Sequence, residues 1–158
     1  MEQRVFKQND VIFRQGDAAD CMYAVRTGSV GIFLDFGGPS ELKLTELHAG
    51  QYLGEMGLLD SAPRSATAVA LSDDTAVDVI TEQGFQAAFD ENPEQFINML
   101  QQMSSRLRRV TRDYAEACRT VADVVEAEKA GEEKSDALKH RIAKTLAGYQ
   151  NAAPAEEE

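Results

Sequence analysis

The chain has 158 residues, of which 43% are hydrophobic and 27% are charged, and its formal net charge is −11. This length suffices for one domain plus an appendage, and the apolar content can fill a core. The acidic balance argues against a broad surface for nucleic-acid phosphates, which needs clustered Lys and Arg side chains. The sequence has neither a run of about eighteen apolar residues nor a hydrophobic signal core, so we expect a cytoplasmic protein with no membrane partner.

Metal, disulfide and nucleophilic chemistry have little support in the sequence. Cys21 and Cys118 lack the spacing of paired thiols, which argues against a disulfide framework or a zinc site. His48 and His140 are too few and too isolated to bind a metal or to run a Ser/His triad. Because no activated nucleophile or general acid/base pair is recognisable, we expect a binding protein with no metal, no cofactor and no enzymatic activity.

Residues 1 to about 82 have the pattern of short strands and turns that is typical of an all-β domain. Short segments rich in Val, Ile, Phe, Tyr and Thr alternate with turn-forming clusters such as Gly16-Asp17 and Thr27-Gly28. Alternating apolar residues predict strands over four ranges: 22–25, 30–34, 42–47 and 75–80. Many short strands within one domain predict a sandwich or a jelly-roll β-barrel.

Within this region, residues 54–68 carry the chemistry of an anion site. Gly54 and Gly57 permit a close approach of the backbone to a ligand. The segment after Gly57 is long enough for one helical turn, whose free N–H groups favour a phosphate. Arg64 supplies a fixed positive fork for phosphate oxygens, and Ser65 adds a hydroxyl and a backbone N–H at the same place.

Glu55 and Arg64 admit two interpretations. An ionised Glu55 can only accept hydrogen bonds, so it suits a sugar hydroxyl better than a phosphate. The alternative is structural: Arg64 is a surface arginine on a turn, and Glu55 is its salt-bridge partner.

From about Thr81 the pattern changes to that of helices. A short amphipathic helix is expected over residues 82–90, with Phe85 and Phe89 on one face. A long helix is expected from residue 93 to about residue 128, with apolar residues at alternating steps of four and three: Phe96, Leu100, Met103, Leu107, Val110, Tyr114, Ala117, Val121 and Val124. This spacing is typical of a coiled coil and predicts a homodimer through residues 96–124. The alternative, a stripe that only covers the barrel, fits less well because a helix rising about 1.5 Å per residue would extend past one small barrel.

The last part of the chain predicts one more helix and a tail. Leu138, Ile142, Leu146 and Tyr149 share one helical face, so an amphipathic helix is expected over residues 131–150. Residues 151–158 are acidic and expected to be disordered. Since a helix-turn-helix cannot fit into the last dozen residues, no DNA partner is expected. The expected divisions are therefore a barrel with a short helix (1–91), a dimerisation helix (92–130), an amphipathic helix (131–150) and the tail (151–158).

The segments Leu53-Gly54-Glu55-Met56-Gly57-Leu58 and Pro63-Arg64-Ser65-Ala66-Thr67 together resemble the phosphate-binding cassette of the cyclic nucleotide-binding domain family. This family includes the catabolite activator proteins, the regulatory subunits of cyclic-AMP-dependent kinase and nucleotide-gated channels. Leu53 stands in the place of the usual aromatic residue, and Ala19 stands where the family often has glycine. The resemblance implies a mainly β protein, a jelly-roll barrel of the double-stranded β-helix type, followed by a long dimerisation helix.

The resemblance also implies a ligand site in three parts. The cassette would contribute Gly54, Glu55, Met56, Gly57, Arg64, Ser65 and Ala66. Ile32 and Leu44 match the aliphatic positions that sandwich the nucleotide base, although each could equally be ordinary core. On the long helix, Arg106 matches an arginine that pairs with the cassette glutamate, Thr111 lies near the place of a base-contacting hydroxyl, and Val110 replaces a threonine beside it.

These observations favour a stand-alone sensor of cyclic nucleotides that dimerises and passes ligand binding through its helix to an unknown downstream protein. Cyclic AMP is the preferred ligand, because cyclic-GMP-selective relatives often have threonine where Ser65 follows the arginine. Cyclic GMP is the lesser option. The alternative is a dimeric protein-interaction scaffold that binds no nucleotide, against which the presence of both Glu55 and Arg64 argues.

Overall fold

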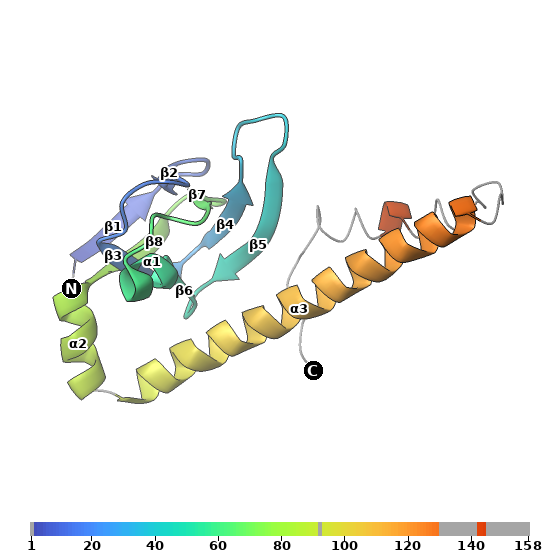
Figure 1. Cartoon of the computed structure of the whole chain (residues 1–158). Coiled ribbons are helices and arrows are strands. Elements are labelled where there is room, and N and C mark those ends of the chain that lie inside the picture. The colour runs from blue at the N-terminus through green and yellow to red at the C-terminus, as the bar shows by residue number, and fades with distance from the viewer. Residues whose placement is uncertain (1, 92, 130–141, 145–158) are drawn as a thin grey trace. The chain divides into compact units, whose positions relative to one another are not determined.

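The computed structural model describes residues 2–91, 93–129 and 142–144, and Figure 1 labels their strands and helices. The strands are β1 (Glu2–Phe6), β2 (Val11–Phe13), β3 (Cys21–Thr27), β4 (Ser29–Leu34), β5 (Leu42–His48), β6 (Tyr52–Leu53), β7 (Thr67–Ala70) and β8 (Thr75–Thr81). The helices are α1 (Glu55–Asp60), α2 (Glu82–Glu91) and α3 (Pro93–Lys129). The four predicted strands and the helices predicted over residues 82–90 and from residue 93 to about residue 128 are all present within a residue or two of their expected ends.

The strands form two antiparallel sheets that face each other across one hydrophobic core. Their orders are β1-β8-β3-β6 and β2-β7-β4-β5. Val25 and Val77 from the first sheet and Val30 and Ala68 from the second are at most 1% exposed. Inward-facing side chains from both sheets thus exclude water from the space between them, which is the main stabilising contribution to such a fold. The expected fold class, a mainly β barrel with C-terminal helices, is confirmed.

A single glycine makes the tight connection between β3 and β4 possible. Gly28 has a φ of +75°, which places it in the left-handed region. A Cβ atom built on it would lie 2.5 Å from Thr75 Oγ1 and 2.7 Å from Ser72 Oγ. The predicted turn at Thr27-Gly28 therefore depends on glycine for both its backbone conformation and its lack of a side chain.

The two C-terminal helices begin by packing on the first sheet. The Phe85 ring of α2 meets the Phe96 ring of α3 edge-on, with centroids 5.8 Å apart, and Met99 is 3% exposed. Gln102 then ties α3 to the β5–β6 turn, since its Oε1 accepts a hydrogen bond from Tyr52 N (3.2 Å) and its Nε2 donates one to Gly50 O (3.0 Å). The start of α3 is thus part of the barrel's own packing.

The described chain divides into two compact units within α3, one ending at Gln102 and the other beginning at Met103. Phe96, the first residue of the expected dimerisation segment 96–124, therefore contributes to the barrel unit. No helix among the described residues combines the length and the apolarity needed to cross a membrane. The helix expected over residues 131–150 lies outside the described residues except at 142–144, which are helical, and so does the expected tail. The divisions drawn from the sequence stay predictions.

Candidate functional site

The expected anion segment lies between β6 and β7 and forms α1. Gly54 caps the start of this helix in the left-handed conformation (φ 73°, ψ 11°). The helix begins at Glu55, so it is longer than the single turn expected after Gly57. It ends after six residues at Asp60 and is capped by Ser61, which is also left-handed (φ 57°). A short helix between two left-handed residues allows the chain to leave β6, turn once and return to β7 past Arg64.

Arg64 is buried, with a relative exposure of 5%. Its Nη1 donates a hydrogen bond to the backbone oxygen of Gly54 (2.9 Å), and its Nη2 donates one to the backbone oxygen of Cys21 (2.6 Å). Nη2 also lies 3.6 Å from Cys21 Sγ. The alternative of a surface arginine is therefore wrong. The side chain turns inward because two carbonyls there can replace its hydration.

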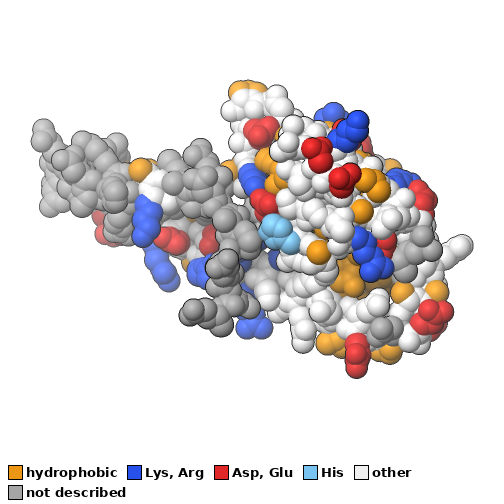
Figure 2. Space-filling model, turned by 180° about the vertical axis from the view of Figure 1, so that it is seen from behind, with side chains coloured by type: hydrophobic (Ala, Val, Ile, Leu, Met, Phe, Trp, Pro, Cys, Tyr) orange, Lys and Arg blue, Asp and Glu red, His pale blue; other side chains and the backbone are white. Residues whose placement is uncertain are grey.

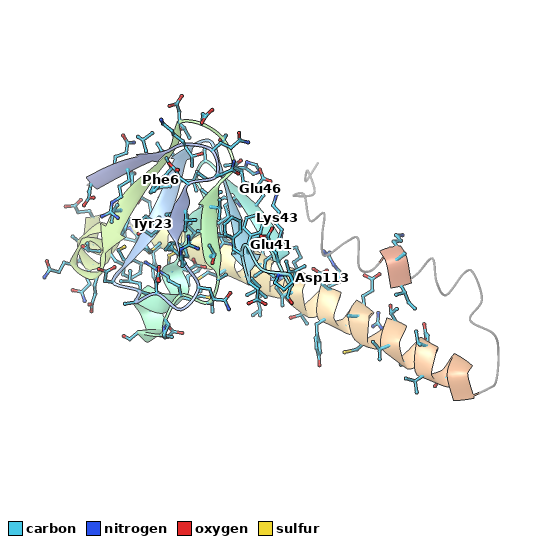
Figure 3. All side chains as sticks on the ribbon, turned by 90° about the horizontal axis from the view of Figure 1, so that it is seen from above. Phe6, Tyr23, Glu41, Lys43, Glu46 and Asp113 are labelled. Carbon is cyan, nitrogen blue, oxygen red and sulfur yellow. The ribbon has the colours of Figure 1, made fainter. Side chains whose placement is uncertain are left out.

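Two aromatic rings lie beside the guanidinium group of Arg64. Its central carbon is 4.5 Å from the ring centroid of Phe13 and 5.7 Å from that of Tyr23. The two rings are stacked on each other, with centroids 5.7 Å apart and an interplanar angle of 20°. These distances fall within the range of a cation–π interaction, which grows stronger when the site is desolvated. Tyr23 lies among the strands of the barrel in Figure 3.

The guanidinium group is not fully satisfied by these contacts. Within the part of the chain that the structure describes, Arg64 Nε is a buried donor with no hydrogen-bond partner. Among the described residues, no carboxylate forms an ion pair with Arg64. A buried cation without a counter-charge is costly, and a buried donor without an acceptor adds to the cost. The arrangement therefore favours an anion that would supply both the charge and the acceptor.

The backbone of Arg64 is fixed as firmly as its side chain. Its carbonyl oxygen accepts a hydrogen bond from Gly16 N (2.9 Å), and its N–H donates one to Asp17 O (2.9 Å). Asp17 also accepts a bond from Arg14 N through Oδ2 (2.8 Å), which closes the turn after β2. The turn that follows β2 thus holds Arg64 in register before β7 begins.

The remaining cassette residues divide into buried and exposed ones. Glu55 is 6% exposed and Ala66 is 5% exposed, whereas Ser65 and Met56 face outward. Gly57 is buried, and a Cβ atom there would overlap Ala19 Cβ and lie 2.8 Å from Ala62 O. Ala19, which stands where the family often has glycine, thus fits here because Gly57 on the opposite side of the contact has no side chain.

The two candidate base-sandwiching residues lie on neighbouring strands. Ile32 is half-buried on β4 and is paired with Thr45 on β5. Leu44 is 39% exposed. It lies at the register shift of β5, between Thr45, which pairs with Ile32, and Lys43, which pairs with the next residue of β4. Ile32 and Leu44 are both on the sheet that also contains β7, the strand that begins at Thr67, the last residue of the cassette. Their contact with a base stays a prediction.

The three helix residues of the expected site lie in the second unit. Val110 is 60% exposed, and the hydroxyl of Thr111 donates a hydrogen bond to Leu107 O within the helix (2.9 Å). The ligand contacts expected of Val110 and Thr111, and the pairing of Arg106 with Glu55, stay predictions.

Sequence reasoning missed the residues that surround the arginine. Tyr23 was recognised only as part of a strand, Phe13 was not singled out at all, and the Cys21 carbonyl carries no signal in a sequence. Phe13 is 51 positions from Arg64 in the chain, so only the pairing of β2 with β7 brings them together. Burial, with a further contribution from a hydrogen bond to Cys21, raises the pKa of Tyr23 to about 12. Tyr23 therefore remains a neutral phenol beside the cation at physiological pH.

Among the described residues, no group of three or more His, Cys, Asp or Glu side chains is placed to hold a metal ion. On the face shown in Figure 2, acidic and basic side chains are interspersed rather than gathered into one patch. A two-sheet barrel whose buried arginine has no carboxylate partner among the described residues has the features of a domain that binds a small anion.

Comparison with known proteins identifies the family. The profile described as "Cyclic nucleotide-binding domain" matches residues 3–92, more than half of the chain. The chain belongs to the cyclic nucleotide-binding domain family. The matched residues contain both sheets, the cassette and α2.

Characterised relatives and a solved structure agree with this assignment. The chain is 35% identical over 107 residues to the cyclic AMP receptor protein of Thermus thermophilus, covering 68% of this chain and 49% of that protein. It is also 35% identical over 83 residues to a cAMP-dependent protein kinase regulatory subunit of Blastocladiella emersonii, covering 51% of this chain and 21% of the relative. The crystal structure of the Thermus thermophilus catabolite activator protein is similar with a TM-score of 0.65 at 27% identity, covering 93% of this chain and 77% of that one. The chain thus matches half or less of the length of these two relatives.

Proposed function

We propose that this protein is a sensor that binds a cyclic nucleotide, most readily cyclic AMP, and that Arg64 binds the ligand's phosphate. The observation that carries this proposal is the buried guanidinium group, which has an unpartnered Nε and no carboxylate partner among the described residues. A cyclic phosphodiester carries one negative charge and exposed oxygens. It would therefore supply the acceptor and the counter-charge that this arginine lacks.

The other parts of the ligand have candidate contacts nearby. Glu55, a carboxylate acceptor one residue from Gly54, suits the ribose hydroxyl. Ile32 and Leu44 offer apolar contact to the base. Serine at position 65 favours cyclic AMP over cyclic GMP, because it differs from the threonine often found in cyclic-GMP-selective relatives. Valine at position 110 removes one expected base contact, so discrimination between the two bases is expected to be modest.

Isothermal titration of the full chain with cyclic AMP, cyclic GMP and a cyclic dinucleotide tests the proposal. Cyclic AMP is expected to bind most tightly. Arg64→Ala should weaken its binding by about 2–5 kcal/mol, because it removes a charge-assisted contact and leaves the phosphate buried without a partner. Glu55→Gln should cost less, since the amide still offers one acceptor.

Arg4→Ala is a suitable control for Arg64→Ala. Arg4 lies on β1, has about half of its side chain exposed and pairs with Glu2. The Arg4→Ala variant therefore removes an arginine of the same barrel at little structural cost. This variant should bind cyclic AMP as the wild-type chain does. A folded Arg64→Ala variant with unchanged affinity would contradict the phosphate assignment.

A second part of the proposal concerns assembly and output. Leu107, Tyr114 and Val121 are spaced by seven residues on α3 and are 67%, 70% and 62% exposed. Large apolar side chains repeated at heptad spacing favour pairing with the same helix of a second copy. We infer that the chain forms a homodimer within residues 96–124 and that ligand binding is passed through α3 to a downstream protein. A dimeric scaffold that binds no nucleotide would share this surface, and the titration with cyclic AMP distinguishes the two.

A further inference from the structure

We propose that Phe13 is a positioning residue for the ligand's phosphate, because its ring holds the guanidinium group of Arg64 in place and keeps the Arg64 Nε donor available. This inference rests on the proposed function, since it assumes that Arg64 binds the phosphate. Phe13 lies outside the cassette, at the end of β2, and no local pattern places that strand at the site.

The first support is the geometry around the guanidinium group. The guanidinium carbon lies over the Phe13 ring at 4.5 Å from its centroid, while the carbonyl oxygens of Gly54 and Cys21 accept hydrogen bonds from the two terminal nitrogens. One ring and two carbonyl groups thus restrain the guanidinium group. Arginine is a long side chain with many rotamers, so a group fixed before the ligand arrives loses less conformational freedom on binding.

The second support is that Phe13 and the turn after it act on the same arginine. Phe13 is the last residue of β2, and the turn that follows contains Gly16 and Asp17, which hydrogen-bond the Arg64 backbone on both sides. One short stretch of chain therefore fixes the Arg64 backbone and supports its side chain. A structural element used only for core packing would have no need to make both kinds of contact.

The third support concerns which of the two rings is responsible. Tyr23 is 4% exposed, belongs to the core cluster, and lies 1.2 Å farther from the guanidinium carbon than Phe13 does. Phe13 is half-buried at the barrel's edge and stacks on Tyr23. The Tyr23 ring therefore lies beside Phe13, and Phe13 makes the nearer contact with the cation.

The test compares Phe13→Leu, which removes the ring, with Phe13→Tyr, which keeps it. In calorimetric titrations of the full chain, Phe13→Leu should weaken cyclic AMP binding roughly 3- to 30-fold, the range expected for a desolvated cation–π contact. Phe13→Tyr should retain the wild-type affinity for cyclic AMP to within roughly threefold. If the leucine variant does not fold, Phe13→Met carries the same comparison, because methionine is apolar and flexible enough to fill the space without a ring.

Two further measurements separate positioning from a general loss of stability. The Rp and Sp phosphorothioate analogues of cyclic AMP replace different phosphate oxygens with sulfur. The ratio of their affinities therefore reports which phosphate oxygen the Arg64 guanidinium group contacts. Phe13→Leu should change this ratio. Phe33→Leu is the matched control, since it removes another buried ring of the barrel that packs on Phe36, and it should leave the ratio unchanged.

A double-mutant cycle decides whether Phe13 acts through Arg64. In the Arg64→Ala background, Phe13→Leu should cause no further loss of affinity. The positioning role is overturned if Phe13→Leu binds with wild-type affinity and ratio, or if its effect persists fully in that background. If Arg64→Ala itself binds like the wild type, or the wild type does not bind, the proposed function fails and the positioning role fails with it. Loss of binding in Arg64→Ala with no effect of Phe13→Leu overturns the positioning role alone.

Discussion

Gly54→Ala is expected to weaken ligand binding through Arg64, an effect that is distinct from the backbone strain of alanine in a left-handed conformation. Gly54 is left-handed, with a φ of +73°, and an added Cβ would lie 2.5 Å from Arg64 Nη1. The same nitrogen donates a hydrogen bond to the Gly54 carbonyl. Alanine must therefore either move the guanidinium group or shift the start of α1.

Two contributions make up the expected effect. Placing alanine in the left-handed region costs about 1–2 kcal/mol of folding free energy. Displacing Arg64 adds an effect on ligand affinity, about 1.5–3 kcal/mol if the charge-assisted contact with phosphate is lost. Gly37→Ala supplies the control for the first contribution, because Gly37 has a φ of +80° and a Cβ there would meet nothing within 4 Å.

The assay is chemical denaturation combined with cyclic AMP titration for both variants. Both should lose free energy of unfolding, Gly54→Ala at least as much as Gly37→Ala, but only Gly54→Ala should lose affinity. In the Arg64→Ala background, Gly54→Ala should cause no further loss of affinity. Equal affinity of the Gly54→Ala and Gly37→Ala variants would refute the reasoning, because it would show that Arg64 does not need its observed position to bind the ligand.

Two other expectations concern a buried phenol and the long helix. Because the pKa of Tyr23 is raised to about 12, the folded protein holds a proton that the unfolded chain loses near pH 10, so stability should fall by on the order of 2 kcal/mol between pH 10 and pH 12. Absorbance titration of the tyrosines should show a late step that Tyr23→Phe abolishes, and a titration identical in the two proteins would contradict the buried environment. Light scattering of the full chain at tens of micromolar should give about twice the 17.3 kDa monomer mass. Leu107→Glu should reduce that mass toward the monomer, whereas a wild-type monomer would refute the helix-mediated dimer.

Local patterns in the sequence determined the elements of this protein. Strand alternation, turn clusters and helical spacing depend on residues close together in the chain, so both the barrel and the helix from residue 93 could be predicted from them. The same is true of the cassette, where Gly54 and Arg64 lie ten positions apart. Their chemistry pointed to an anion, and the resemblance of the segment pointed to the family to which the chain belongs.

Tertiary structure decided how these parts act on one another. The inward direction of Arg64, its contact with Phe13 and its bond to the Cys21 carbonyl arise because β2 pairs with β7 and because α1 lies against β3. Likewise, the sequence spacing assigns Phe96 to the apolar face of the long helix. In the fold, its edge-on contact with the Phe85 ring makes it part of the barrel unit. Such contacts join residues that share no local pattern. Their energies come from burial and from the pairing of distant groups, which only the folded chain brings together.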